Sequence, residues 1–222
     1  IRSERTIVTA WHPATTVRNR VEMMQVRGEH GRRVQALFTM NDRLAYRRAA
    51  AVIAVTRETQ RALQTVGVRA DFVPPFIEDD EVRPTSRGRS SDCVMVARWL
   101  DNPRKGLSTA IAAVDDVRRR KPNVRLVLVG GFRDPRFAQT LPDFCSLAGV
   151  LEPENVSATL AEAGCCLMPS AWEEFGYAGI ESLASGTPLV VSSELPAFED
   201  VQAQGLVQAA LPASVGAWSA AI

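Results

Sequence analysis

Residues 93–131, CVMVARWLDNPRKGLSTAIAAVDDVRRRKPNVRLVLVGG, decide the fold class of this protein. The apolar run CVMVARW predicts a buried strand, and VRLVLVGG predicts a second strand that ends in paired glycines. Between them, residues 106–120 predict an amphipathic helix, because four apolar side chains share one helical face. These are Leu107, Ile111, Val114 and Val117. A strand, a helix and a second strand in this order are typical of a parallel α/β unit.

The same alternation continues towards the C-terminus. Strands are predicted at AGVLEP (148–153), CCLMPS (165–170) and PLVVSS (188–193), and helices at NVSATLAEAG (155–164) and GYAGIESLASG (176–186). Short, apolar, β-branched strands that alternate with helices predict a Rossmann-like parallel sheet covered on both faces. Ligands of such sheets bind beyond the carboxyl ends of the strands.

The N-terminal part predicts a second, partial α/β domain. RTIVTAW (5–11) and AAVIAVT (50–56) are strand-like, and Thr56 is a good N-cap for a helix that stops at Gly67. The polar stretch EDDEVRPTSRGRSSD (78–92) has no apolar periodicity and predicts a linker. We therefore expect a partial domain over residues 1–77, this linker, and a truncated domain over residues 93–222. The chain does not begin with Met, which suggests a piece of a longer polypeptide.

Composition excludes some classes of function. The net charge is +1, hydrophobic residues make up 46% of the 222 residues, and no apolar run approaches the length of a membrane span. Residues 1–70 nevertheless carry 13 arginines and five acidic residues, which suits either an anionic membrane surface, an acidic substrate or a solvated helix surface. That region has few aromatic side chains for stacking on bases, so nucleic-acid binding ranks last. The four cysteines lack a C-x-x-C spacing and are expected to be buried thiols.

An acidic pair, Glu173 and Glu181, borders the predicted helix at 176–186. Unpaired backbone N–H groups at the start of that helix should face the space over the strand end, where an anionic ligand can bind. The small residues there suggest that something approaches the backbone closely, and Glu181 could accept hydrogen bonds from a ribose diol. On spacing alone, both carboxylates would be exposed helix surface.

A basic pair, Arg98 and Lys105, is the second candidate for contact with an anionic ligand. Arg98 lies at the carboxyl end of the first predicted strand of this domain, and Lys105 precedes the next helix. Two cations beside a helix N-terminus suit a diphosphate, although either residue alone would be read as surface charge. The chain has no P-loop, no H-E-x-x-H, no G-x-S-x-G and no cluster of metal ligands, so we expect no metal and no cofactor.

These segments resemble a known family. The C-terminal part of the chain resembles the donor-binding half of a retaining glycosyltransferase of family 4, with the GT-B fold. The resemblance is carried by residues 97–131, by residues 151–193 and by PAFEDV (196–201). Residues 49–78 resemble the end of the acceptor half of that fold. The resemblance covers roughly residues 45–202, and its separate blocks occur in the order of the family.

The resemblance implies roles for matching residues. Arg98 and Lys105 correspond to the pair that binds the donor diphosphate, and Glu173 to the carboxylate near the donor sugar. Glu181 matches the carboxylate that holds the ribose, and His12 matches a histidine that faces the reacting sugar. The segment FGYAG should lie against the sugar and phosphates, and two residues should flank the base. These donor-binding residues are Phe175, Gly176, Tyr177, Ala178, Gly131 and Val150.

The implied function is transfer of a sugar from a nucleotide-diphosphate sugar to an acceptor hydroxyl, with retention and without a metal. The acceptor would be a sugar, a glycolipid or a small molecule. A hydrolysing nucleotide-sugar epimerase of the same fold and a non-catalytic nucleotide-sugar-binding fragment are the alternatives. The 24 arginines against two lysines suggest a GC-rich bacterial genome, and so glycosylation of the cell envelope, of glycolipids or of secondary metabolites. The buried thiols predict a cytoplasmic protein, and the Arg-rich N-terminal part predicts a peripheral contact with the inner face of the membrane.

Overall fold

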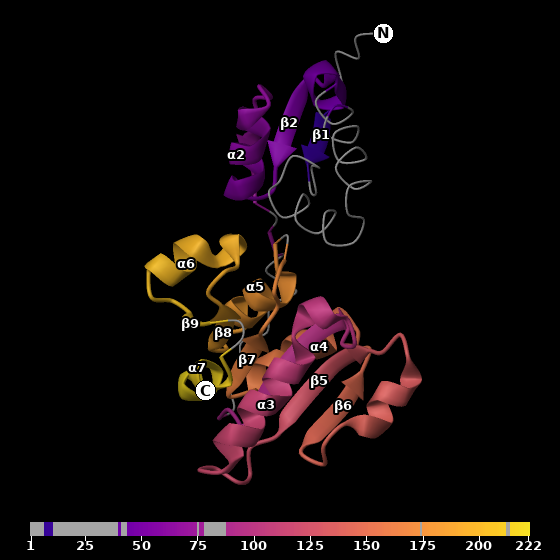
Figure 1. The fold of residues 1–222 in the computed structure, drawn as a ribbon, viewed down its shortest axis with the longest axis vertical. Helices are drawn as coiled ribbons and strands as arrows, with labels where there is room; N and C mark the ends of the chain where they lie inside the picture. The colour runs from indigo at the N-terminus through magenta and orange to yellow at the C-terminus, as the bar shows by residue number, and fades with distance from the viewer. Residues whose placement is uncertain are drawn as a thin grey trace. The chain divides into compact units, whose positions relative to one another are not determined.

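The protein consists of two compact units, Ile1–Phe76 and Ile77–Ile222, each with its own parallel sheet (Figure 1). A computed structural model describes residues 7–10, 40, 44–74, 76–77, 88–173, 175–211 and 214–222. These ranges leave out residues 78–87, which are most of the predicted linker. They also leave out more than half of the Arg-rich region, residues 1–70.

The described part of the N-terminal unit is a three-stranded parallel sheet, ordered β1-β2-β3, with helix α2. Its elements are β1 (Ile7–Ala10), β2 (Ala51–Ala54), α2 (Arg57–Thr65) and β3 (Asp71–Phe72). The predicted cap of α2 is confirmed, because the Thr56 hydroxyl accepts a hydrogen bond from the Thr59 N–H at 3.0 Å. Gly67 follows with a φ of +73°, a left-handed conformation that stops the helix.

The C-terminal unit is built on a sheet of six described strands in the order β6-β5-β4-β7-β8-β9. Every neighbouring pair in this sheet runs parallel, which confirms the predicted α/β class. The strands are β4 (Cys93–Trp99), β5 (Leu126–Gly131), β6 (Cys145–Gly149), β7 (Cys165–Met168), β8 (Leu189–Ser192) and β9 (Gln208–Ala210).

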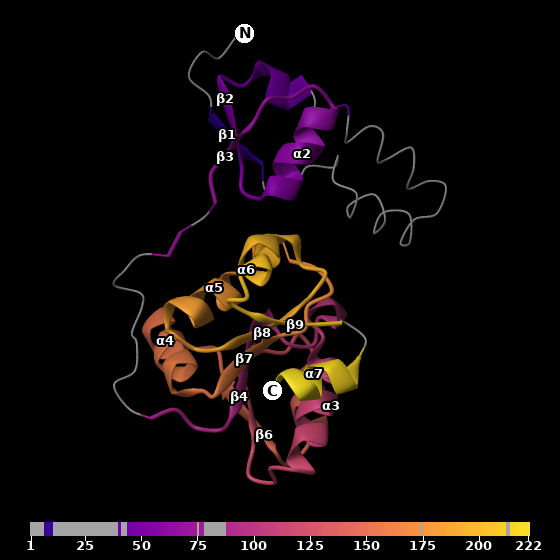
Figure 2. The same ribbon diagram turned by 90° about the vertical axis from the view of Figure 1, so that its left-hand side faces the viewer.

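Helices cover both faces of this sheet, as Figure 2 shows. The α-helices are α3 (Leu107–Arg118), α4 (Pro153–Glu162), α5 (Tyr177–Ala184), α6 (Glu199–Ala203) and α7 (Val215–Ala221). Three 3₁₀ turns, η2 (Pro103–Lys105), η3 (Pro135–Thr140) and η4 (Pro196–Phe198), lie in the connections. Helices α3 and α7 pack on one face, and α4 and α5 on the other.

The alternation of side chains along β4 separates two cores. Cys93 and Met95 pack with α3 and with the fully buried Trp218 of α7. Val94, between them in sequence, packs with Leu160 of α4 on the opposite face. A strand that is buried on both faces must be apolar at every position, which explains the continuous run that predicted it.

The strand order reverses between β4 and β7. The chain leaves β4 towards β5 and β6 on one side, and leaves β7 towards β8 and β9 on the other. The carboxyl ends of β4 and β7 therefore lie at the reversal of strand order, which is the usual position of the ligand site in open α/β sheets.

One predicted strand was placed wrongly. The sequence predicted a strand over residues 148–153, but β6 ends at Gly149, which has a φ of +77°, and α4 already begins at Pro153. Val150 is 80% exposed, so its apolar side chain does not mark a buried strand. Within the described ranges, no helix is long and apolar enough to cross a bilayer.

Candidate functional site

Lys105 and Glu173 meet at the reversal of strand order. Lys105 ends η2 after β4, Glu173 lies in the loop after β7, and the Lys105 Nζ is 2.5 Å from the Glu173 Oε1. The hydroxyl of Ser170 donates a hydrogen bond to the same oxygen at 2.6 Å. Only 9% of the Glu173 side chain and 20% of the Lys105 side chain are exposed, so this ion pair is well shielded from water. The fold thus brings together two predicted site residues that are 68 positions apart.

Further contacts tie the two loops to each other. The Ala171 N–H donates to the Arg104 carbonyl at 2.8 Å, and the Arg104 guanidinium lies 4.4 Å from the centre of the Trp172 ring. Gly106 has a φ of +72°, and a Cβ atom at this position would lie 2.2 Å from the Pro169 carbonyl oxygen. Only glycine permits this close approach, which carries Lys105 towards the loop of Glu173.

Helix α5 begins at Tyr177, beside this ion pair in the chain. Its N-cap, Gly176, has a φ of +79° and no side chain, so the first-turn N–H groups have no side-chain cap. The structure supplies an internal reason for the small residues here. A Cβ atom would lie 2.8 Å from the Phe198 ring at Gly176 and 2.5 Å from it at Gly179. These glycines admit the buried Phe198, so their presence alone does not indicate a ligand.

The other residues of this segment differ in exposure. Phe175 is buried, whereas Tyr177 is 42% exposed, and their rings meet edge to face with centroids 5.2 Å apart. Ala178 is partly buried and packs towards the core on the α4 and α5 face. Of the predicted FGYAG contacts, Tyr177 is the side chain most available to a ligand.

Arg98 lies near the ring of the neighbouring Trp99. It is exposed near the end of β4, with its guanidinium 5.8 Å from the centre of the Trp99 ring. Arg133, in the loop after β5, lies 5.9 Å from the same ring. In the described part of the chain, no hydrogen bond or ion pair joins Arg98 to Lys105 or Glu173. Its predicted contact with a diphosphate therefore stays a prediction.

Gly131 and Val150, the predicted flanks of the base, lie next to each other. A Cβ atom at Gly131 would be 3.6 Å from Val150 Cγ2 and 3.5 Å from the Trp99 ring. The preceding Gly130 has a φ of +130°, and a Cβ atom there would lie 1.7 Å from the Ala97 carbonyl oxygen. Gly130 is thus needed for the close packing of β5 on β4, whereas a side chain at Gly131 would make only ordinary contacts.

Glu181, on α5, lines a cavity of about 290 Å³ next to β4 and α4. Its other walls are mostly apolar, with one hydroxyl: Val96, Leu151, Pro153, Val156 and Ser157. A mostly apolar pocket with a carboxylate at its side suits a nucleoside, because a base needs apolar walls and a ribose needs a hydrogen-bond acceptor.

Several predictions fall outside this site. His12 lies outside the described residues. Among the described residues, His, Cys, Asp and Glu side chains form no group of three or more that could hold a metal ion.

Cys93 and Cys165 begin adjacent strands, with their sulfur atoms 3.6 Å apart. Burial raises the pKa of Cys166 to about 12, so that thiol is a core side chain, as expected.

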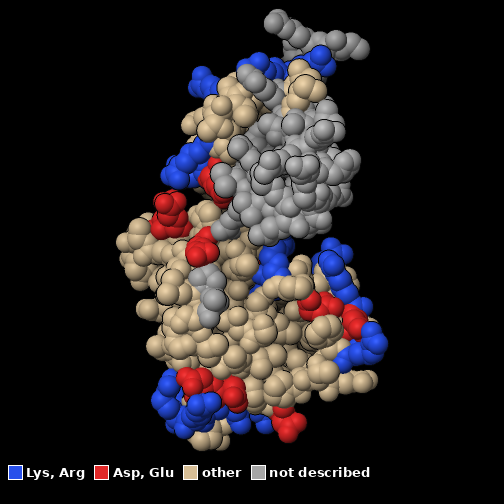
Figure 3. All heavy atoms as spheres, in the orientation of Figure 1, with Lys and Arg blue, Asp and Glu red and all other residues tan. Residues whose placement is uncertain are grey.

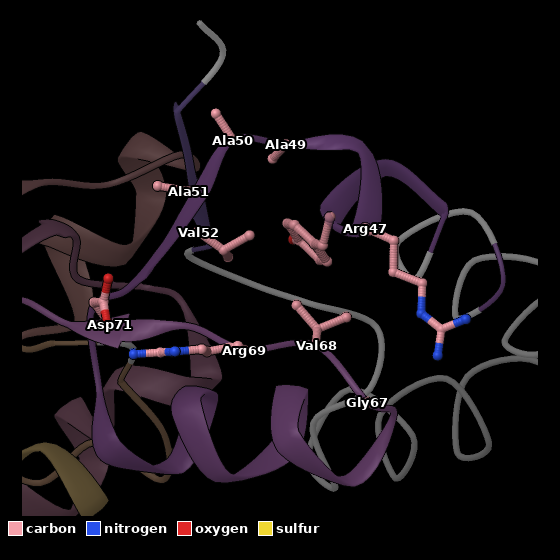
Figure 4. A pocket seen from close by; sticks show the side chains of 10 residues that line it. Arg47, Ala49, Ala50, Ala51, Val52, Gly67, Val68, Arg69 and Asp71 are labelled. Carbon is pink, nitrogen blue, oxygen red and sulfur yellow. The ribbon is translucent and has the colours of Figure 1, made fainter. Parts of the chain in front are cut away.

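A separate cavity of about 460 Å³ lies in the N-terminal unit, at the amino ends of β2 and β3 (Figure 4). The side chains of Arg47 and Arg69 extend from it in opposite directions, away from Val52 and Val68. The two cations therefore do not converge on one anion. The cavity is also at the wrong end of the strands for the usual ligand site of a parallel sheet.

The charges in view are mixed. In Figure 3, basic and acidic side chains of the C-terminal unit lie next to each other on the visible face, without one large area of a single sign. The predicted contact with an anionic membrane was assigned to the Arg-rich N-terminal part, most of which lies outside the described residues, and it stays a prediction.

Sequence reasoning missed three contributors to the site. Ser170 holds Glu173, Trp172 stacks with Arg104, and Asp101 accepts hydrogen bonds from the loop after β5. Position at the carboxyl end of a strand was the available signal for all of them, because that is where each loop begins.

A sequence profile of a family described as Family 4 Glycosyltransferase in conflict systems matches residues 12–215. The chain is 28% identical over 158 residues to a phosphatidyl-myo-inositol mannosyltransferase of Mycobacterium tuberculosis, covering 68% of the chain and 42% of that protein. It is 30% identical over 126 residues to an MMP alpha-(1->4)-mannosyltransferase of Mycolicibacterium hassiacum, covering 54% of the chain and 30% of that protein. The chain thus spans less than half of either relative.

Solved structures share the fold at lower identity. Sucrose-phosphate synthase from Thermosynechococcus elongatus superposes with a TM-score of 0.75 at 21% identity, covering 97% of this chain and 57% of that one. HepE of Anabaena, in complex with UDP and glucose, superposes with a TM-score of 0.71 at 17% identity, covering 97% and 60%. Both comparisons extend over nearly all of the chain.

Proposed function

We propose a function from the premise that this chain belongs to the family 4 glycosyltransferases and has their GT-B fold. The chain contains the donor-binding part, and the end of the acceptor part, of an enzyme that transfers a sugar from a nucleotide-diphosphate sugar to an acceptor hydroxyl. The anomeric configuration is retained and no metal takes part. The observation that carries this proposal is the Lys105–Glu173 pair, held at the reversal of strand order beside the start of α5.

The proposed binding mode uses the cavity beside Glu181 and the loops that follow β4 and β7. The nucleoside enters the cavity beside Glu181, whose carboxylate accepts from the ribose hydroxyls. Its diphosphate extends towards Lys105 and the N–H groups at the start of α5. The sugar then lies near Glu173. Arg98 reaches the diphosphate by leaving the face of Trp99, over which it lies here.

Catalysis in this proposal is electrostatic. Negative charge builds up on the diphosphate as the bond to the sugar breaks, and Lys105 and the helix N-terminus stabilise that charge. One such preorganised donor is typically worth about 2.7–4 kcal/mol of transition-state stabilisation. Glu173 holds Lys105 in place, and its shielded carboxylate lies where positive charge would develop on the sugar.

The donor is tested first by binding. The full-length protein is mixed with UDP, GDP, ADP or TDP, with and without EDTA, and its melting temperature is measured. One nucleotide should stabilise the protein, by about 2.7 kcal/mol at a hundred times its dissociation constant, and EDTA should not remove the effect. Stabilisation that disappears with EDTA would contradict metal independence.

Transfer is tested next. Curated relatives are named mannosyltransferases and a structural neighbour was solved with UDP and glucose, so GDP-mannose and UDP-glucose are the first donors to compare. The product anomer is assigned by NMR. Lys105→Ala should slow turnover by about 10²–10³-fold. The matched control is Lys121→Ala, which changes the other lysine of the chain at an exposed position. Equal turnover of both variants would refute the role of Lys105.

A further inference from the structure

We propose that Asp101 is a positioning residue for the transfer reaction. Lys105 belongs to a turn after β4, and the Asp101 carboxylate attaches that turn to the loop after β5. The inference rests on the proposed function, in which Lys105 meets the donor diphosphate. Asp101 itself need not touch the substrate.

The anchor consists of charge-assisted hydrogen bonds. Asp101 Oδ2 accepts from the backbone N–H of Arg133 at 2.8 Å and from that of Asp134 at 3.0 Å. Next to it, the Leu100 N–H donates to the Gly131 carbonyl at 2.8 Å. A carboxylate that accepts two backbone N–H groups holds a loop more firmly than neutral pairs do. Asp101 therefore fastens the start of the β4 loop to the end of β5.

The charge of Asp101 persists at neutral pH. Partial burial opposes ionisation, but the N–H groups of Asp134 and Arg133 outweigh it and hold the pKa of Asp101 below its usual value. The anchor is thus a carboxylate under all conditions in which an enzyme of this kind would be assayed.

A short series of contacts connects this anchor to Lys105. Asn102, the next residue, caps η2 by accepting the Arg104 N–H on its side-chain oxygen at 3.1 Å. The Lys105 N–H donates to the Asn102 carbonyl at 2.8 Å, and the Lys105 side chain then reaches Glu173. The turn is also held on its β7 side, by the bond from Ala171 to Arg104. Removing the Asp101 carboxylate leaves that second attachment and the bond from Leu100 to Gly131, and it loses only the two bonds to the loop after β5.

The expected effect is a misplaced cation in a folded protein. A displacement of about 1 Å at a reacting centre can cost about a hundredfold in rate, so Asp101→Ala should lower kcat between about tenfold and a hundredfold. Asp101→Asn should retain most of the activity, because an amide oxygen can still accept both N–H groups.

The chain offers a matched control. Asp92 Oδ1 accepts the Arg125 N–H at 3.0 Å and so joins the same two strands, β4 and β5, at their opposite ends. Asp92→Ala removes a similar bond far along the strands from Lys105. It should therefore leave kcat unchanged, even if it lowers the melting temperature as much as Asp101→Ala does.

Coupling to Lys105 separates positioning from general stability. If Asp101 acts through Lys105, Asp101→Ala should lower kcat much less in the Lys105→Ala background than in the parent. Equal losses in both backgrounds would overturn the inference and leave the proposed function standing. If Lys105→Ala alone does not change turnover, the proposed function is what fails.

A second measurement does not need activity. Hydrogen–deuterium exchange in the full-length protein should be faster for residues 100–106 and 133–134 in Asp101→Ala than in Asp92→Ala. Unchanged exchange in these segments would overturn the inference whatever the activity data show.

Discussion

Replacing Lys105 by Met tests the ion pair at the centre of the site without reference to any ligand. The change keeps the aliphatic stem and removes the charge, so that among the described residues only Ser170 still donates a hydrogen bond to Glu173. A shielded carboxylate that loses one partner typically costs about 1–3 kcal/mol. Because one fifth of the Lys105 side chain is exposed, solvent screening favours the lower half of that range. In a chain of this size, 1 kcal/mol shifts the melting temperature by about 2–4 °C, so a loss of several degrees is expected.

A double-mutant cycle isolates the pair. Glu173→Gln in the Lys105→Met background removes the unpaired charge and should recover part of the lost stability. The cycle should therefore give a coupling free energy that favours the Lys105–Glu173 pair. The control, Lys121→Met, should have the same melting temperature as the parent protein. The assay is thermal and urea unfolding of all variants, followed by tryptophan fluorescence.

One result would refute the reasoning. Suppose that Lys105→Met and Glu173→Gln each have the melting temperature of the parent, and that their effects on the free energy of unfolding are additive. The two side chains then do not form a stabilising pair. The proposed diphosphate site would then lose the contact on which it is built.

Further predictions concern packing, binding and reactivity. Gly179→Ala should lose about 1–3 kcal/mol, because its Cβ atom would lie 2.5 Å from the buried Phe198 ring. Gly216→Ala, in α7 with open space around it, should be neutral or stabilising in the same unfolding assay. Glu181→Gln should weaken nucleotide binding in calorimetry about tenfold, and unaltered affinity would place the ribose elsewhere. Cys145 and Cys165, which are partly exposed, should be alkylated by iodoacetamide at pH 8 before the buried Cys93 and Cys166, and peptide mass spectrometry would reveal any other order.

The amino-acid sequence determined the elements themselves. Apolar runs predicted β4, β5, β7 and β8, a helical stripe predicted α3, and Thr56 and Gly67 predicted the two ends of α2. Each of these signals is local, since periodicity, capping and glycine conformation act within a few residues. The same local reasoning failed at residues 148–153, where apolar Val150 and Leu151 follow the strand rather than form it.

Only the tertiary structure decided which of the candidate residues meet. Lys105 contacts Glu173 because β7 lies beside β4 in the sheet, whereas Arg98, closer to Lys105 in sequence, lies over Trp99 instead. The reason for Gly176 was equally hidden, since its neighbour Phe198 arrives from a later connection. Such contacts depend on strand order and on packing between distant segments, and no pattern within a short stretch of chain encodes either of them.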